Sequence, residues 1–259
     1  MYKLNPSDIK KSVEMQGLSL EELIVPDSII LTFSHTILDY LMRKKDFQVW
    51  KWKGEDFSPY TRSQKALKLI NKYKCPIACF LPSMGASPLI AFCEELIYFG
   101  AKRIILICAT WSLGEKYLPK GVFHLPNFAF GIDGTSFHYG NQEGRIRSES
   151  HAYNSLKMIL EDNRVKWKEG GVGSCEAVYR ITHEMVEKYR TLGCLSMDNG
   201  EIASLFALAK EYQIPIGVLV HPYLNLDKGW IPSYIDQIYI NTCKKQADIA
   251  LRMLELLSS

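Results

Sequence analysis

A tight turn built around a glycine is the first feature of this sequence that suggests ligand binding. Residues 83–87, Ser-Met-Gly-Ala-Ser, separate an apolar strand-like run from a helical pattern. Gly85 allows close approach to the backbone, and Ser87 followed by proline is typical of a helix start. Because free N–H groups at a helix N-terminus bind anions and hydroxyl-rich ligands, Ser83, Met84 and Gly85 are candidate contacts. Any tight strand-to-helix turn can have this composition, so the segment needs support from others.

Two side chains that can hold or move a proton follow other strand-like runs. Glu201 begins a helical pattern just after residues 193–197, and its carboxylate can accept hydrogen bonds from hydroxyl groups. His221 follows the apolar run 215–220, and an imidazole there can protonate or hydrogen-bond a leaving group. Each has an alternative interpretation, because the helix dipole also favours a first-turn glutamate and neighbouring backbone can satisfy a histidine.

The elements that would position these residues alternate between strands and helices. Apolar or β-branched runs predict strands at residues 28–33, 48–52, 75–81, 103–109, 122–132, 170–175, 193–197 and 215–220. Apolar residues at three- and four-residue spacing predict helices at residues 63–72, 88–99, 152–161, 177–189, 201–212 and 234–257. This order predicts an α/β fold with a central, mostly parallel or mixed, twisted sheet flanked by helices.

Residues 1–259 are expected to form a single domain, because no repeat, low-complexity tract or flexible linker interrupts them. In open α/β sheets, ligands bind beyond the carboxyl ends of the strands. That rule selects the segments 82–87, 110–114, 176–179, 198–201 and 221–223.

Composition narrows the classes of function. The 259 residues are 47% apolar and 23% charged, with a formal net charge of +3, which is typical of a globular protein. The scattered basic residues argue against a nucleic-acid partner, and the short apolar runs argue against a membrane. None of the seven cysteines forms a CxxC pair, so buried, reduced thiols and a cytoplasmic location are expected. The six histidines show no metal-ligand spacing such as HxxxH, so no metal is expected.

Four segments of the sequence match motifs of one enzyme family, and they occur in that family's order. The segments are SMGASP at residues 83–88 followed by Glu94-Glu95-Leu96, Asp133-Gly134-Thr135-Ser136 with Tyr139, Ser174-Cys175-Glu176-Ala177-Val178-Tyr179, and SMDNGEIASLF at residues 196–206. Together they resemble the nucleoside phosphorylase superfamily, which contains purine nucleoside and uridine phosphorylases and related nucleosidases. The resemblance implies that superfamily's α/β fold.

The resemblance also implies a reaction at the N-glycosidic bond of a purine or pyrimidine nucleoside. With phosphate as the second substrate, the products would be a free base and a pentose 1-phosphate. Glu201 falls at the family's ribose-binding glutamate, with Met197 and Gly200 beside it, and His221 falls where a residue assists the leaving base. Such bonds break through an oxocarbenium-like sugar, which a nearby carboxylate stabilises.

Further site residues are implied by the same resemblance. The candidate base contacts are Thr110, Trp111, Glu176, Val178, Tyr179 and His221. The candidate contacts of the phosphate or another nucleophile are Ser83, Met84, Gly85, His35 and Ala109. Trp111 replaces a glycine that is usual in the family's GTxG motif and should reshape the base pocket, whereas Tyr179 can either stack on a base or pack against the protein.

The sequence departs from the family where phosphate is bound. The glycine-rich GDPxR turn is Thr-Phe-Ser-His-Thr at residues 32–36, and Leu106 replaces the arginine of the family's IRxGTxG strand. An apolar side chain cannot hold a dianion, so phosphate binding should be weak unless other residues compensate. The candidates for compensation are Ser34, His35 and, from a neighbouring subunit, Lys44 or Lys45.

Three functions therefore remain open. The first is phosphorolysis of a nucleoside, the second is hydrolysis by a nucleosidase that uses water, and the third is binding of a nucleoside without catalysis. Phosphate is a possible co-substrate, and no other cofactor is expected. The resemblance also implies a homo-oligomer, either a dimer or a trimer of dimers, in which the aromatic region 50–60 either contacts a neighbour or packs on the sheet.

Overall fold

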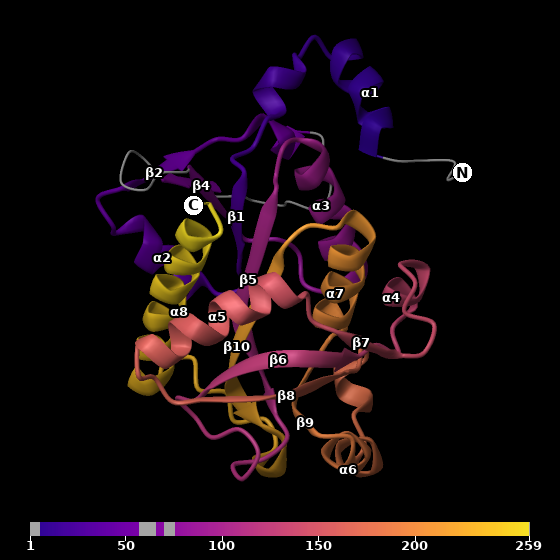
Figure 1. Cartoon of the computed structure of the whole chain (residues 1–259), viewed down its shortest axis with the longest axis vertical. Helices are drawn as coiled ribbons and strands as arrows, with labels where there is room; N and C mark the ends of the chain where they lie inside the picture. The colour runs from indigo at the N-terminus through magenta and orange to yellow at the C-terminus, as the bar shows by residue number, and fades with distance from the viewer. Residues whose placement is uncertain (1–5, 57–65, 70–75, 259) are drawn as a thin grey trace.

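One mixed sheet runs through the computed structural model, which describes residues 6–56, 66–69 and 76–258 (Figure 1). Its strands are β1 (Ser28–Leu31), β2 (Phe47–Trp50), β3 (Ala66–Leu69), β4 (Ile77–Phe80), β5 (Arg103–Ser112), β6 (Phe123–Phe130), β7 (Arg145–Arg147), β8 (Trp167–Ser174), β9 (Cys194–Asp198) and β10 (Ile216–Asn225). Their spatial order is β2-β3-β4-β1-β5-β9-β8-β6-β10, with β7 paired to β6. Because β10 also pairs with β5, the strands β5, β9, β8, β6 and β10 close into a ring.

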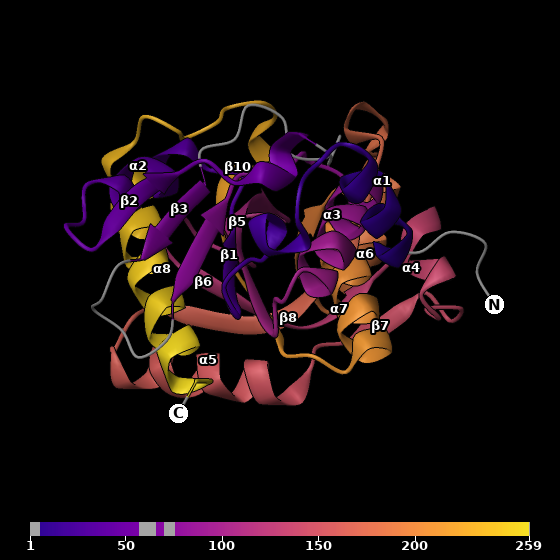
Figure 2. The same ribbon diagram turned by 90° about the horizontal axis from the view of Figure 1, so that it is seen from above.

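Helices cover both faces of this sheet (Figure 2). They are α1 (Ile9–Met15), α2 (His35–Met42), α3 (Ala86–Tyr98), α4 (Gly134–His138), α5 (Ser150–Asp162), α6 (His183–Thr191), α7 (Glu201–Tyr212) and α8 (Gln237–Leu256). Alternate residues of β5 point to opposite faces, so Leu106 packs in the apolar cluster with α3 and α7, whereas Ile105 and Ile107 pack in the cluster with α2, α5 and α8. The predicted α/β fold with a mixed sheet between helices is confirmed.

Two strands extend further at their carboxyl ends than the sequence predicts. β5 continues to Ser112 rather than ending at residue 109, and β10 continues to Asn225 rather than ending at residue 220. These two ends pair with each other, with a register shift between Pro222 and Leu224. Thr110, Trp111 and His221 therefore lie on strands and not in loops.

Two helix predictions are wrong. Residues 66–69, within the expected helix 63–72, form β3, which pairs antiparallel with β2 and β4; the rest of 63–72 lies outside the described residues. The apolar pattern of this short segment fits both the two-residue period of a strand and the 3.6-residue period of a helix. Pairing with β2 and β4 makes it a strand. The expected helix 177–189 divides into a 3₁₀ turn (Val178–Arg180) and α6, because Thr182 caps α6 by accepting a hydrogen bond from the N–H of Met185.

The aromatic region 50–60 contributes to the core rather than to an open surface where the structure describes it. Trp52 is 1% exposed, packs edge-on against Phe80 and Phe92, and donates a hydrogen bond to the carbonyl of Leu23 at 2.9 Å. Residues 57–60 lie outside the described part of the chain.

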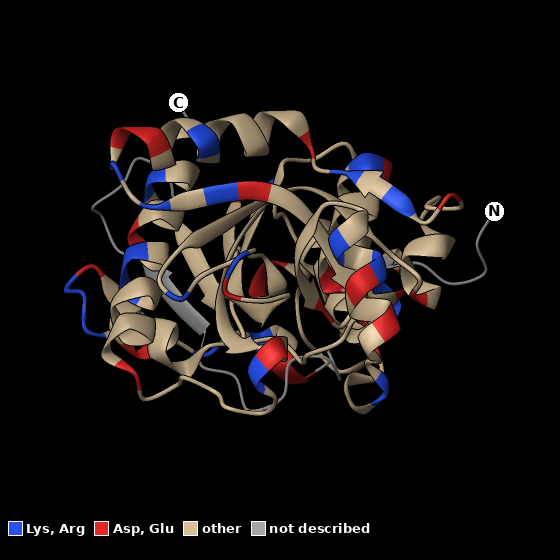
Figure 3. Cartoon of the chain, turned by 90° about the horizontal axis from the view of Figure 1, so that it is seen from below, with Lys and Arg blue, Asp and Glu red and all other residues tan. Residues whose placement is uncertain are grey.

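The described cysteines match their prediction. Six of them are buried and none forms a disulfide, whereas Cys75 lies outside the described residues. No helix in the described part of the chain is long and apolar enough to cross a bilayer. Figure 3 shows Lys and Arg segments interspersed with Asp and Glu segments over the lower face of the molecule.

Candidate active site

The glycine turn and Glu201 meet at the carboxyl ends of β4 and β9. The N–H of Gly85 donates a hydrogen bond to Oε1 of Glu201 at 2.9 Å, although the two residues are 116 positions apart. Asn199 adds a bond from its backbone N–H to Oε2 at 2.9 Å and a longer one from its side-chain amide to Oε1 at 3.5 Å. Glu201 is only 4% exposed, so these donors replace much of its lost hydration.

Two glycines make this approach of α3 and α7 possible. Gly85 has a φ of 108° and Gly200 a φ of 90°, which side chains rarely adopt. A Cβ at Gly200 would also lie 3.0 Å from the Cβ of Asp133 and 3.4 Å from that of Ala86. A larger side chain at position 200 therefore has no room here. Asp133 in turn accepts a hydrogen bond from the hydroxyl of Ser204 at 2.9 Å, which ties α4 to α7.

A second carboxyl group, that of Asp198, lies beside Glu201. Its two oxygens accept the N–H groups of Gly200 at 3.0 Å and Ile202 at 2.8 Å, which caps the start of α7. Removal from water, and then the charge of Glu201, raise the pKa of Asp198 well above its usual value. Removal from water also raises the pKa of Glu201, but the N–H groups of Gly85 and Asn199 oppose that shift. Of the two carboxyl groups, Asp198 is therefore the one whose surroundings more strongly favour the protonated form.

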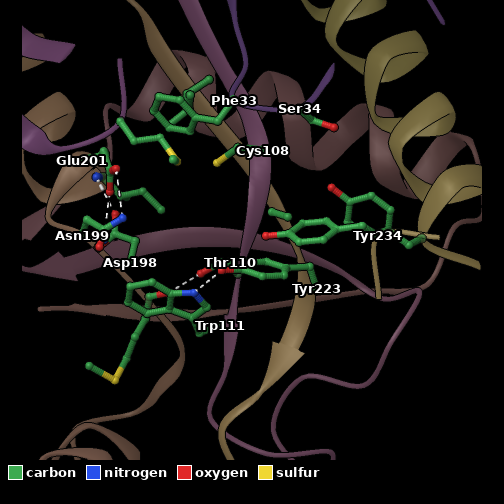
Figure 4. Close-up of a pocket in the computed structure, with 16 residues that line it drawn as sticks. Phe33, Ser34, Cys108, Thr110, Trp111, Asp198, Asn199, Glu201, Tyr223 and Tyr234 are labelled. Atoms are coloured by element: carbon green, nitrogen blue, oxygen red, sulfur yellow. Dashed lines mark hydrogen bonds between the residues drawn. The ribbon is translucent and has the colours of Figure 1, made fainter. Parts of the chain in front are cut away.

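These carboxyl groups line a pocket that encloses about 640 Å³, part of it open to solvent (Figure 4). The aromatic residues that line it are Phe33, Trp111, Tyr223, Tyr234 and Tyr239. The indole N–H of Trp111 donates to the hydroxyl of Tyr223 at 2.6 Å, and the rings of Tyr223 and Tyr234 stack with centroids 4.9 Å apart. Figure 4 places Glu201, Asn199 and Asp198 at one end of the pocket and Tyr223 with Tyr234 at the other.

A β-bulge explains why Tyr223 reaches the pocket. Pro222 pairs with Thr110 and Leu224 pairs with Trp111, so Tyr223 is an extra residue in β10. Such a bulge bends the strand and re-aims its side chains. The sequence pattern predicts that this strand ends at residue 220, before the bulge, and therefore does not indicate that Tyr223 points into the pocket.

The end of the pocket where the family motif places phosphate is mainly apolar, and the predicted candidate Ser34 lines it with a hydroxyl group. Phe33, Leu106 and Cys108 line it, and no Lys, Arg or His lines the pocket within the described residues. His35 is exposed at the start of α2 and does not line the pocket. Lys44 is paired with Asp248, its Nζ lying 2.8 Å from a carboxylate oxygen.

Several predicted site residues come together in this pocket. Those that line it are Met84, Ala109, Thr110, Trp111, Met197 and Glu201. Gly85 and Gly200 adjoin it through the contacts given above. Ser83 is half-buried in the same turn but does not line the pocket.

His221 does not reach the pocket. It is 1% exposed, its ring lies 5.0 Å from that of Tyr239, and its Nε2 lies 3.5 Å from Sγ of Cys243. Its partner across the sheet, Ala109, belongs to the face that α8 covers, so the imidazole points into the core. Burial lowers its pKa to about 3, and the ring therefore stays neutral at physiological pH.

The segment after β8 also lies outside the pocket. Tyr179 is 86% exposed, with its ring 6.3 Å from that of Trp230, and Val178 packs in the apolar cluster beside α6. Glu176 is exposed, and partial burial together with the charge of Asp133 raises its pKa. None of these three candidate base contacts lines the pocket.

Sequence analysis missed five main pocket residues. They are Phe33, Asp198, Asn199, Tyr223 and Tyr234. Asp198, Asn199 and Tyr223 fall in segments already selected because they follow strands, so their position was a usable signal. The described residues contain no group of three His, Cys, Asp or Glu side chains that could hold a metal ion.

Comparison with known proteins assigns the chain to a protein family. Residues 57–254 match the model of the phosphorylase superfamily, and the chain belongs to that superfamily. A comparison with curated protein sequences gives no match.

Solved structures share the fold at low sequence identity. The chain is similar to the purine nucleoside phosphorylase of Toxoplasma gondii in complex with immucillin-H, with a TM-score of 0.76, 18% identity and coverage of 92% of this chain and 93% of that one. It is similar to the uridine phosphorylase of Vibrio fischeri ES114, with a TM-score of 0.74, 18% identity and coverage of 90% and 93%. For the AMP nucleosidase of Bacteroides thetaiotaomicron VPI-5482 the TM-score is 0.72, the identity 15% and the coverage 99% of each chain.

Proposed function

We propose that this chain is a nucleosidase, an enzyme that hydrolyses the N-glycosidic bond of a purine or pyrimidine nucleoside. One observation carries the proposal: the pocket has carboxyl groups at one end and an aromatic wall at the other, and no cationic side chain lines it within the described residues. The carboxylate suits the sugar hydroxyls and the aromatic wall suits a planar base. The lack of cations favours water over phosphate as the nucleophile.

Glu201 is the proposed sugar contact. An ionised carboxylate offers about four acceptor positions, and Gly85 and Asn199 occupy three of them. Oε2 accepts only one of these bonds, so it can accept another from a sugar hydroxyl. The negative charge also stabilises the positive charge that develops on the sugar as the bond breaks.

Asp198 is the proposed proton donor to the leaving base. Its raised pKa keeps a proton on the carboxyl group while Glu201 is ionised, and it lines the same pocket. Two neighbouring carboxyl groups with separated pKa values are the usual arrangement for an acid and a charge-stabilising group. Trp111 and Tyr223 would hold the base by stacking and packing.

Water is the proposed nucleophile. A phosphate dianion in this pocket would meet Leu106 and Phe33 and no positive partner among the described residues, which is strongly unfavourable. Phosphorolysis stays a competing prediction that needs cations from outside the described residues, and the homo-oligomer and the cytoplasmic location also stay predictions. The proposed reaction uses no cofactor.

A panel of purine and pyrimidine nucleosides, incubated with and without phosphate, tests the proposal. Chromatography should detect free base at the same rate in both conditions. Free base only in the presence of phosphate would identify a phosphorylase. Bound but intact nucleoside, measured by calorimetry on the same samples, would identify a non-catalytic binding protein.

A further inference from the structure

A second cavity lies between α8, the start of β6 and the turn that joins α5 to β8. It encloses about 830 Å³, part of it open to solvent, and is therefore larger than the pocket beside Glu201. Ile238 and Lys245 line it from α8, Gly121 from the turn just before β6, and residues 163–166 from the turn between α5 and β8. None of its lining residues belongs to the pocket beside Glu201.

The charge of this cavity is entirely positive. Arg164, Lys166 and Lys245 line it, and no Asp or Glu does so among the described residues. In the described part of the chain, no carboxylate forms an ion pair with any of the three. Asp236, just before α8, is already paired with Lys120 at 2.7 Å. Three unpaired cations around one cavity attract an anion.

The wall that carries Arg164 is fixed by the protein itself. Asn163 donates to the carbonyl of Ile159 at 2.6 Å and accepts from the guanidinium of Arg252 at 2.8 Å. Arg164 then takes a φ of 50°, and its N–H donates to the carbonyl of Glu161 at 3.1 Å. The position of the arginine therefore follows from a defined turn rather than from a free loop.

The opposite wall combines close packing with apolar surface. Gly121 approaches α8 so closely that an added Cβ would lie 2.9 Å from Cγ2 of Ile238. Ile238 is half exposed, and Val165 lines the cavity beside the cations. An occupant therefore meets both positive charge and apolar carbon.

We propose that this cavity binds a phosphate monoester of a small organic molecule. A guanidinium binds phosphate through two parallel hydrogen bonds, and lysine ammonium groups add point charges. The apolar walls at Val165 and Ile238 contact the organic part, and a bare inorganic phosphate would leave them and most of the space unused. The site is independent of the proposed nucleosidase reaction.

Titration calorimetry with the full chain tests this assignment, using phenyl phosphate, inorganic phosphate and phenol as probes. Phenyl phosphate should bind at least about 10-fold more tightly than either other probe, and raised salt should weaken it. Equal affinity for inorganic phosphate would overturn the monoester assignment in favour of a simple anion site. Lack of phenyl phosphate binding would overturn the whole proposal.

Two conservative variants locate the binding. Arg164→Asn suits the left-handed backbone, and Lys245→Gln keeps a good helix former, so both proteins should fold. Each should weaken phenyl phosphate binding about 10-fold. Lys210→Gln, at an exposed position of α7, is the matched control and should bind like the unaltered chain. Unchanged binding in both cavity variants, or loss of binding in Glu201→Ala, would contradict the location.

Discussion

The two cavities beside the N-terminal half of α8 have opposite chemical character. Two carboxyl groups and an aromatic wall line the pocket beside Glu201, whereas three cations line the cavity beside Arg164. Tyr239 contributes to the first and the preceding residue, Ile238, to the second, so a single helix serves both. The comparison shows that the described cations suited to phosphate lie in the cavity beside Arg164. Among the described residues, none lies where the superfamily motif places phosphate.

Of the changes considered, removal of the charge of Glu201 should have the largest effect, and it should affect only the pocket beside Glu201. Glu201→Gln keeps the shape but loses the charge that stabilises the developing sugar cation, so kcat/KM for a cleaved nucleoside should fall about 10³-fold. Phenyl phosphate binding to the other cavity should not change. Glu176→Gln, outside the pocket, is the control and should retain activity. Equal activity of the two variants would remove Glu201 from the mechanism.

Asp198→Asn tests the second carboxyl group. Because the protonated form is the proposed acid, activity of the unaltered chain should fall as pH rises through the raised pKa of Asp198. The variant should lose about 10²-fold in kcat and show no such alkaline decline in its pH–rate profile. An unchanged alkaline decline would assign the titration to another group.

Two buried histidines, His124 and His221, should lower the stability of the fold in acid. Burial lowers the pKa of His124 to about 4 and that of His221 to about 3, so below pH 6.5 the unfolded chain binds protons that the folded chain excludes. The contribution of the histidines to the free energy of unfolding should therefore fall between pH 7 and pH 5, by about 2 kcal/mol for each histidine, whereas the raised pKa of Asp198 contributes in the opposite direction. Urea unfolding measures it, and His124→Gln should remove about half of the decrease. An equal pH dependence of the free energy of unfolding in the unaltered chain and in His124→Gln would contradict this burial.

The smallest effect is expected at the aromatic wall. Tyr223→Phe removes the hydroxyl that accepts the indole N–H of Trp111 but preserves the stacked ring, so nucleoside affinity should fall only about 2- to 10-fold. Calorimetry with the intact nucleoside measures the change. Tyr179→Phe, on an exposed ring outside the pocket, should have no effect. A similar loss in both variants would argue against base binding at Tyr223.

The sequence predicted the α/β sheet, the positions of Gly85 and Glu201 beyond strand ends and several of the residues that line the pocket, because these depend on local patterns at strand ends. The sequence could not predict that Tyr223 points into the pocket, since the register shift after Pro222 arises from pairing with β5. It misplaced His221 for a related reason: β10 continues past residue 220, so the imidazole keeps the core-facing side of the strand. The charges of the second cavity come from two distant segments, which only the fold brings together.

The decisive measurement is the dependence of nucleoside cleavage on phosphate concentration, with free pentose followed by ¹H NMR and any pentose 1-phosphate by ³¹P NMR. The account predicts a rate that does not change as phosphate is added, and free pentose as the product. A rate that rises from zero with phosphate, together with a pentose 1-phosphate signal, would contradict it.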